Sequence, residues 1–201
     1  MAWLNWPNRI TLVRIGLVPP FVICLLNLNA GGEVWRRTGF VLFVLMALSD
    51  ALDGFLARRL GESTPLGRYL DPVGDKLLVT SSVILLAIDA TAVPGFRLPN
   101  WVPVIAIGKD VLTVIGFLLV YALTGQFFVK ARVLGKACTL VQLVMIGFCL
   151  IAPDLPAAFQ RCRSAFWWLA SAAAVLALAD YVRIGNRFAA ERGLPAASTR
   201  K

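Results

Sequence analysis

Six separate runs of apolar residues make up most of this chain, and they constrain its fold more than any other feature. The runs cover about Thr11–Leu28, Thr38–Ala57, Pro72–Ile88, Trp101–Leu123, Ala137–Ile151 and Ala165–Tyr181. A helix needs about 20 apolar residues to cross a bilayer core, so we expect the two short final runs to extend into flanking polar residues. Turn-forming Pro, Gly and Asn residues separate the runs. The pattern predicts an all-α integral membrane bundle of six transmembrane helices.

Composition agrees with a membrane protein. Of the 201 residues, 59% are apolar and 15% charged, with a mean hydropathy of +0.76. These values exclude a soluble globular domain, a disordered chain and a charge-rich coiled coil. The length fits a single membrane domain over residues 1–201, with a polar cytoplasmic tail from about residue 186. The four cysteines form no C-x-x-C pair, and we expect them to act as small apolar residues.

The net charge of +9 allows two interpretations, a nucleic-acid partner or basic loops on the cytoplasmic side of a bilayer. We favour the second because the chain is so apolar, and we expect no nucleic-acid partner. If the N-terminus is cytoplasmic, fourteen of the 20 Lys and Arg residues fall on the cytoplasmic side and five on the other. This bias predicts that both termini are cytoplasmic.

The chain contains no histidine. Its absence excludes an imidazole base, a Ser-His-Asp or Cys-His site, and any metal site with histidine ligands. A proton acceptor must therefore be a carboxylate, lysine, tyrosine or cysteine. A metal site must consist mainly of oxygen ligands or of cysteines.

Four of the 11 acidic residues are aspartates at the predicted cytoplasmic ends of the second and third helices. Asp50 and Asp53 share a helix face, and that face spans about 140° when Gly54, Ala57 and Arg58 are included. Asp71 and Asp75 lie one turn apart and also share a face. Because a short loop joins the two helices, the two acidic faces can meet.

This aspartate cluster favours a divalent metal site. Four carboxylates in a low-dielectric environment need compensating cations, and oxygen ligands favour magnesium or manganese. Two such ions about 4 Å apart could clamp a pyrophosphate for displacement at phosphorus. The small residues Gly54 and Ala57 allow a ligand to approach closely, and Arg58 offers a planar fork to a phosphate. The alternative is that the aspartates are interfacial charges paired with Arg58, Arg59, Arg68 and Lys76.

The spacing D-x2-D-G-x2-A-R-x8-G-x3-D-x3-D is complete from Asp50 to Asp75. It resembles the signature of the CDP-alcohol phosphatidyltransferases. The segments Pro7–Arg14 and Leu70–Lys76 are similar to the branch of that family that makes phosphatidylglycerophosphate. The resemblance implies six transmembrane helices, a homodimer, and transfer of a phosphatidyl group from CDP-diacylglycerol to an alcohol with release of CMP.

The resemblance also implies roles for individual residues. Asp50, Asp53, Asp71 and Asp75 would hold two divalent cations, magnesium or manganese, and Asp75 would also take the proton from the attacking hydroxyl. The residues that would bind CDP-diacylglycerol are Asn8, Thr11, Gly54, Ala57, Arg58, Thr64 and Gly67. The lipid donor and the bilayer are expected partners, and a bacterial inner membrane with a cytoplasmic active site is the expected location.

The alcohol acceptor is less closely defined by the sequence. Glycerol 3-phosphate carries a phosphate and needs cations, for which the candidates are Lys136, Arg132 and Lys109. Lys136 resembles a lysine near this position in phosphatidylglycerophosphate synthases. The neighbours Lys109 and Asp110 lie inside the fourth run, so each is expected to find a partner on another helix. Other acceptors remain open, namely phosphatidylglycerol (giving cardiolipin), an inositol phosphate or serine, as does a non-enzymatic transporter or bundle.

Overall fold

A computed structural model describes residues 6–28, 33–60, 65–124 and 133–190. Within these ranges it describes all side chains except those of residues 6–8, 51, 53–60, 65–72, 123–124 and 186–190. Of the predicted site residues, Thr64 and Arg132 lie outside the described residues. The side chains of Asn8, Asp53, Gly54, Ala57, Arg58, Gly67 and Asp71 also lie outside the described set, although these residues belong to helices.

The described chain is helical throughout its regular structure and contains no strand, which confirms the all-α prediction. Each of the six apolar runs corresponds to one long helix. These helices are α1 (Trp6–Leu26), α2 (Glu33–Leu60), α3 (Pro65–Leu85), α4 (Trp101–Thr124), α5 (Val133–Ile151) and α7 (Arg163–Ala190). A 3-10 turn, η1 (Ala152–Asp154), and the short helix α6 (Ala157–Gln160) connect α5 to α7.

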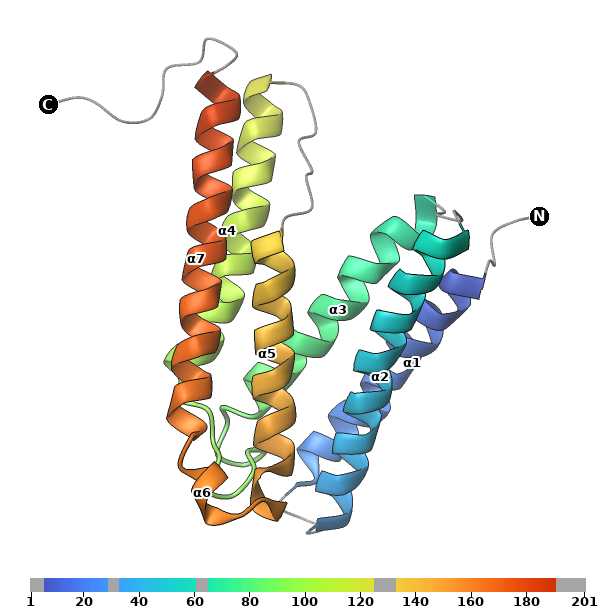
Figure 1. The fold of residues 1–201 in the computed structure, drawn as a ribbon, viewed down its shortest axis with the longest axis vertical. Coiled ribbons are helices and arrows are strands. Elements are labelled where there is room, and N and C mark those ends of the chain that lie inside the picture. Colours follow the sequence, from blue (N-terminus) through green and yellow to red (C-terminus); the bar gives the residue numbers. More distant parts are fainter. Residues whose placement is uncertain (1–5, 29–32, 61–64, 125–132, 191–201) are drawn as a thin grey trace, which may run out of the picture.

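The long helices alternate in direction, so that α1 begins and α7 ends at the same end of the bundle (Figure 1). They form two groups. Helix α1 packs against α2 and α3, whereas α7 packs against α4 and α5. Helices α2 and α3 meet α4 and α5 between the groups, where the contacts are fewer. The predicted aspartates therefore belong to the group formed by α1, α2 and α3.

The apolar core joins the two groups. Phe21 of α1 and Phe43 of α2 lie with their ring centroids 6.2 Å apart, and both are buried together with Met145 and Ile146 of α5. At Gly147 of α5, an added Cβ would lie 3.2 Å from Cε1 of Phe43. A glycine here lets α5 approach α2 closely, which side chains of ordinary size would prevent.

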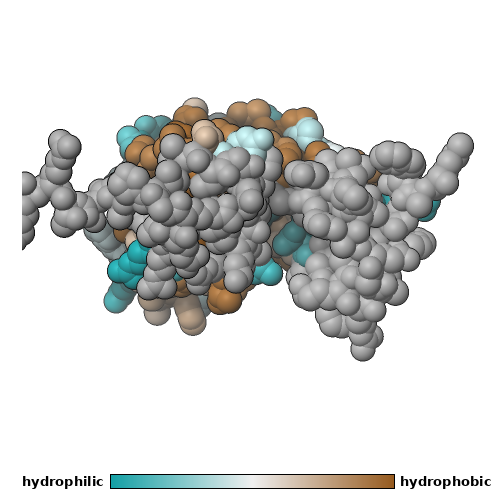
Figure 2. All heavy atoms as spheres, turned by 90° about the horizontal axis from the view of Figure 1, so that it is seen from above, coloured by the Kyte–Doolittle hydropathy of each residue, from teal (hydrophilic) through white to brown (hydrophobic). Residues whose placement is uncertain are grey.

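Four stretches of the described chain are long and apolar enough to cross a membrane, namely Arg9–Leu26, Trp101–Ala122, Val133–Asp154 and Ala157–Gly185. Many large apolar side chains on these helices are exposed, including Leu118 and Leu119 of α4 and Leu176 of α7. Figure 2 shows hydrophobic residues along much of the outer surface that it draws in colour. Because exposed apolar surface of this extent is typical of lipid contact, the chain is an integral membrane protein.

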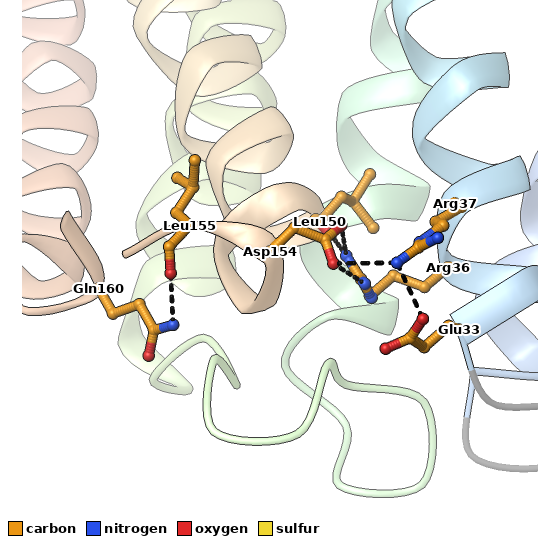
Figure 3. Close-up of polar contacts among 7 residues, drawn as sticks. All are labelled: Glu33, Arg36, Arg37, Leu150, Asp154, Leu155 and Gln160. Carbon is orange, nitrogen blue, oxygen red and sulfur yellow. Dashed lines mark hydrogen bonds and ion pairs between the residues drawn. The ribbon is translucent and has the colours of Figure 1, made fainter. Parts of the chain in front are cut away.

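An ion-pair cluster holds the two groups together at the end where α2 begins and α5 ends (Figure 3). Arg36 of α2 donates hydrogen bonds to Oδ1 and Oδ2 of Asp154, at 2.7 and 2.9 Å, and to the carbonyl oxygen of Leu150 at 2.8 Å. Arg37 lies 3.5 Å from the same carboxylate and 2.9 Å from Glu33. This bidentate contact fixes α2 against the end of α5.

Candidate active site

The aspartate motif is divided between two helices, α2 and α3, which both pack against α1. Asp50 and Asp53 belong to α2, and Asp71 and Asp75 belong to α3. Asp75 interacts electrostatically with Asp50 of α2 and with Arg14 of α1. Two of the four predicted metal ligands, on different helices, therefore lie close enough for their charges to interact.

Arg14 links α1 to this place. Its Nη1 lies 2.5 Å from Oδ1 of Asp50, and the arginine side chain is only 1% exposed whereas that of Asp50 is 44% exposed. Helix α1 also passes close to α3 beside Asp75, since a Cβ added at Gly74 would lie 3.3 Å from Cγ1 of Ile15. The glycine before Asp75 thus allows the helix carrying Arg14 to approach the helix carrying Asp75.

Thr11 lies three residues before Arg14 in α1 and is fully buried. This spacing places both residues on one face of the helix. Thr11 is the one predicted CDP-diacylglycerol contact whose side chain the structure describes. Its position on the face that carries Arg14 puts it on the side of α1 that faces the aspartates.

A second polar cluster lies where α3 meets α4. Oδ1 of Asp110 in α4 is 2.5 Å from Nζ of Lys76 in α3 and 2.7 Å from Nζ of Lys109. Nζ of Lys109 also lies 3.9 Å from Sγ of Cys138 in α5. Asp110 and Lys109 thus each contact another helix, as expected, and in addition they pair with one another. Asp75 interacts electrostatically with Lys76 and Asp110, so this cluster adjoins the aspartates.

The predicted acceptor residues differ in accessibility. Lys136 is exposed near the beginning of α5, one residue after Gly135, where an added Cβ would lie 3.0 Å from Oη of Tyr181 in α7. Lys109 is only 6% exposed, and its ammonium is already paired with Asp110. Lys136 is therefore the described candidate with an accessible ammonium.

Carboxylate oxygens suit a hard divalent cation, and Asp50 and Asp75 each carry such oxygens. Asp50 uses Oδ1 toward Arg14, and its side chain is half-exposed. Asp75 has no ion pair to another side chain that the structure describes. No three His, Cys, Asp or Glu residues among those described lie close enough to hold a metal. The side chains of the other two predicted ligands, Asp53 and Asp71, lie outside the described residues.

The sequence profile of CDP-alcohol phosphatidyltransferases matches residues 4–179, which include helices α1 to α6 and the larger part of α7. The chain belongs to the CDP-alcohol phosphatidyltransferase family. Members of this family are phosphatidyltransferases, so the protein is an enzyme of this type. The match extends well beyond the aspartate motif, and it includes α4 and α5, which carry Asp110 and Lys136.

Individual relatives agree with the family match. The chain is 37% identical over 161 residues to a CDP-diacylglycerol–glycerol-3-phosphate 3-phosphatidyltransferase of Bacillus subtilis, covering 76% of this chain and 79% of the relative. It is 43% identical to a protein of the same name from Pseudomonas fluorescens, over 41% of each chain. A probable phosphatidylglycerophosphate synthase of Mycobacterium tuberculosis is 31% identical, over 71% of this chain and 64% of the relative.

Sequence reasoning missed two contacts of this phosphatidyltransferase. Of the expected partners of the aspartates, Arg58, Arg59 and Arg68 have side chains outside the described set. Among the described side chains, Asp50 pairs with Arg14, and Lys76 pairs with Asp110 rather than with an aspartate of the motif. A signal for Arg14 exists in the sequence, because Asn8, Thr11 and Arg14 repeat every three residues in a helix whose other residues, apart from Arg9, are apolar or glycine. Such a polar stripe indicates a helix face turned to polar neighbours.

Proposed function

We propose that this phosphatidyltransferase uses glycerol 3-phosphate as its acceptor and so makes phosphatidylglycerophosphate and CMP from CDP-diacylglycerol. The observation that carries the proposal is the 37% identity, over most of both chains, to a relative named for this reaction. The complete aspartate motif, together with the electrostatic interaction of Asp50 with Asp75, supports the same chemistry in this chain.

Asp50, Asp53, Asp71 and Asp75 are the proposed ligands of two divalent cations, magnesium or manganese. Their support is the carboxylate chemistry of the motif and the absence of histidine from the chain. When bound, such cations neutralise the pyrophosphate and stabilise charge that develops during displacement at phosphorus. Arg14 holds one oxygen of Asp50 and thereby fixes the direction of that carboxylate.

The proposed transfer is a displacement at the phosphorus of the phosphatidyl group. The acceptor oxygen forms a bond to that phosphorus, the bond from phosphorus to the CMP oxygen breaks, and CMP leaves with the electron pair. The carboxylate of Asp75 takes the proton of the acceptor hydroxyl. A carboxylate in this role agrees with a chain that has no imidazole to offer.

Substrate contacts follow from the motif. The CDP part of the donor would contact Asn8, Thr11, Gly54, Ala57, Arg58, Thr64 and Gly67. The phosphate of the acceptor would meet Lys136, with Arg132 and Lys109 as further candidates. The exposed ammonium of Lys136 is the observation that favours it among the three.

The proposed setting is a bacterial inner membrane, crossed by all six long helices of one domain in a homodimer. Helices α2 and α3 would cross with their polar ends at the cytoplasmic face. The concentration of Lys and Arg at one end of the bundle supports a cytoplasmic active site and two cytoplasmic termini. The alternating directions of the helices agree with this topology (Figure 1).

An acceptor panel tests the proposal. Purified protein in lipid nanodiscs receives CDP-diacylglycerol, a divalent cation and one labelled acceptor at a time, and CMP release is measured. We expect release with glycerol 3-phosphate, and little with an inositol phosphate, serine or phosphatidylglycerol. Release with another acceptor alone would contradict the proposed acceptor. No release with any of them would contradict the proposed reaction.

A further inference from the structure

One carboxylate of α4 binds two ammonium groups. Oδ1 of Asp110 lies 2.5 Å from Nζ of Lys76 and 2.7 Å from Nζ of Lys109. Lys76 is the residue that follows Asp75, a predicted metal ligand and base. Asp110 therefore contacts Lys76, the residue next to Asp75 in the chain. It does so from α4, which belongs to the other group of helices.

The side chains of Lys76 and Asp75 leave α3 in different directions. Adjacent helix residues point about 100° apart. The Lys76 ammonium ends at Asp110, and the carboxylate of Asp75 has no ion pair to any other side chain that the structure describes. The result is a carboxylate available for a cation beside a lysine that is bound elsewhere.

If Lys76 were released from Asp110, its ammonium could pair with a carboxylate of the aspartate motif instead. Its side chain is long and flexible, and its ammonium is a compact positive charge. Asp75 interacts electrostatically with Lys76, Asp110 and Asp50. An ammonium that pairs with the Asp75 carboxylate competes with a divalent cation for the same oxygens.

Lys109 binds the same oxygen of Asp110 as Lys76 does. It is buried, its own carbonyl oxygen accepts a hydrogen bond from Oγ1 of Thr113 at 2.7 Å, and its ammonium lies beside Cys138 of α5. This arrangement fixes the Asp110 carboxylate at the junction of α3, α4 and α5. Asp110 is thus anchored in the second group of helices while it binds Lys76 of the first.

We propose that Asp110 is a positioning residue that retains the Lys76 ammonium on α4 and so keeps the Asp75 carboxylate available to a divalent cation. The inference rests on the proposed function, because it concerns the metal ligands of that reaction. Asp110 acts through Lys76 and touches neither substrate nor cation. It resembles the outer residues of a metal site, which orient the ligands or leave them free.

The experiment compares Asp110→Asn, Lys76→Gln and the double variant with the parent, all as full chains in nanodiscs. Manganese binding is measured without substrates, by electron paramagnetic resonance of free Mn²⁺. We expect Asp110→Asn to weaken Mn²⁺ affinity about tenfold. Lys76→Gln in the same chain should restore the affinity to within about threefold of the parent, because the competing ammonium is gone. Asp110→Glu, which keeps the charge, should bind Mn²⁺ like the parent.

Two results would overturn the inference. One is unchanged Mn²⁺ affinity in Asp110→Asn, and the other is a double variant that binds as weakly as Asp110→Asn alone. If Asp110→Asn does not fold because Lys109 is left buried with its charge, the comparison is made between Asp110→Asn/Lys109→Met and the triple variant that also carries Lys76→Gln. The same restoration by Lys76→Gln is then expected, and its absence counts against the inference.

CMP release by the parent protein is measured alongside. A parent that binds Mn²⁺ but releases no CMP with glycerol 3-phosphate contradicts the proposed acceptor and leaves the role of Asp110 standing. A parent that releases CMP while all variants bind Mn²⁺ equally contradicts the role of Asp110 alone. The two failures are therefore distinguishable.

Discussion

The guanidinium of Arg14 in α1 lies 2.5 Å from Oδ1 of Asp50 in α2. The two side chains of this ion pair differ greatly in exposure. The arginine is buried, whereas the aspartate is half-exposed. A buried charge that loses its partner costs more than an exposed one. The pair thus ties the polar face of α1 to the first aspartate of the motif.

The ion pair predicts coupled effects on stability in cation-free protein. Asp50→Asn and Arg14→Met should each lower the thermal unfolding midpoint, because each variant removes one charge of the pair. The double variant should be less destabilised than the sum of the two, with a coupling of about 1 to 2 kcal/mol. Unfolding in detergent with a chelator present measures all four proteins, and additive effects would contradict the prediction.

Asp75→Asn removes the proposed proton acceptor and a proposed metal ligand. We expect CMP release to fall by at least about a hundredfold, in line with the loss of general-base catalysis, while the unfolding midpoint changes little. Asp89→Asn is the matched control, because Asp89 lies beyond α3 at the opposite end of the bundle, paired with Arg97. It should release CMP at the parent rate. Normal turnover in Asp75→Asn would remove Asp75 from the reaction.

Much of the fold follows from the hydropathy pattern, since each apolar run became one long helix. The boundaries follow less well. Helix α3 begins at Pro65 rather than near Pro72, because a proline suits the first turn of a helix and the polar motif residues after it are also helical. Helix α7 continues to Ala190, so residues 186–190, predicted to begin the polar tail, remain helical. Apolar composition marks the part of a helix in contact with lipid or core, and helices extend beyond it.

The sequence predicted which aspartates belong to the candidate site, but it did not predict the ion pairs that Asp50 and Lys76 form. The motif spacing identified Asp50 and Asp75 without any structure. The partners of Asp50 and Lys76 came from α1 and α4, which are distant in sequence, and a spacing rule within two helices cannot report them. Such long-range ion pairs depend on how the helices pack, and here a glycine at position 74 allows α1 to approach α3.

The Arg36 cluster provides a test of stability far from the site. Arg36→Met should lower the unfolding midpoint by several degrees, because it removes a buried guanidinium that makes hydrogen bonds to Asp154 and to the carbonyl of Leu150. Arg37→Met is the control, since Arg37 is 62% exposed and surface ion pairs contribute little. The KM for CDP-diacylglycerol should stay unchanged in both. Equal midpoints for the two variants would show that the bidentate contact does not hold α2 to α5.

Two glycines on the long helices differ in what surrounds them. Gly147 of α5 is half-buried and packs closely against Phe43, whereas Gly116 of α4 is exposed, with nothing within 4 Å of an added Cβ. Gly147→Leu should therefore push α5 away from α2 and destabilise the protein by roughly 1–3 kcal/mol through overpacking. Gly116→Leu should be neutral or slightly stabilising, since glycine is a poor helix former. Thermal unfolding measures both, and similar losses would contradict the close approach of α5 to α2.

Lys136 is exposed near the beginning of α5, where its ammonium can meet a phosphate from the solvent side. Lys136→Ala should raise the KM for glycerol 3-phosphate about tenfold, the size of one charge-assisted contact, and leave the KM for CDP-diacylglycerol nearly unchanged. Arg163→Ala is the control, because Arg163 is also exposed but lies at the opposite end of the bundle, where it donates a hydrogen bond to the carbonyl of Gly95. It should change neither KM. Equal increases for donor and acceptor in Lys136→Ala would place that lysine outside the acceptor site, and the phosphate would then have to be held by other cations.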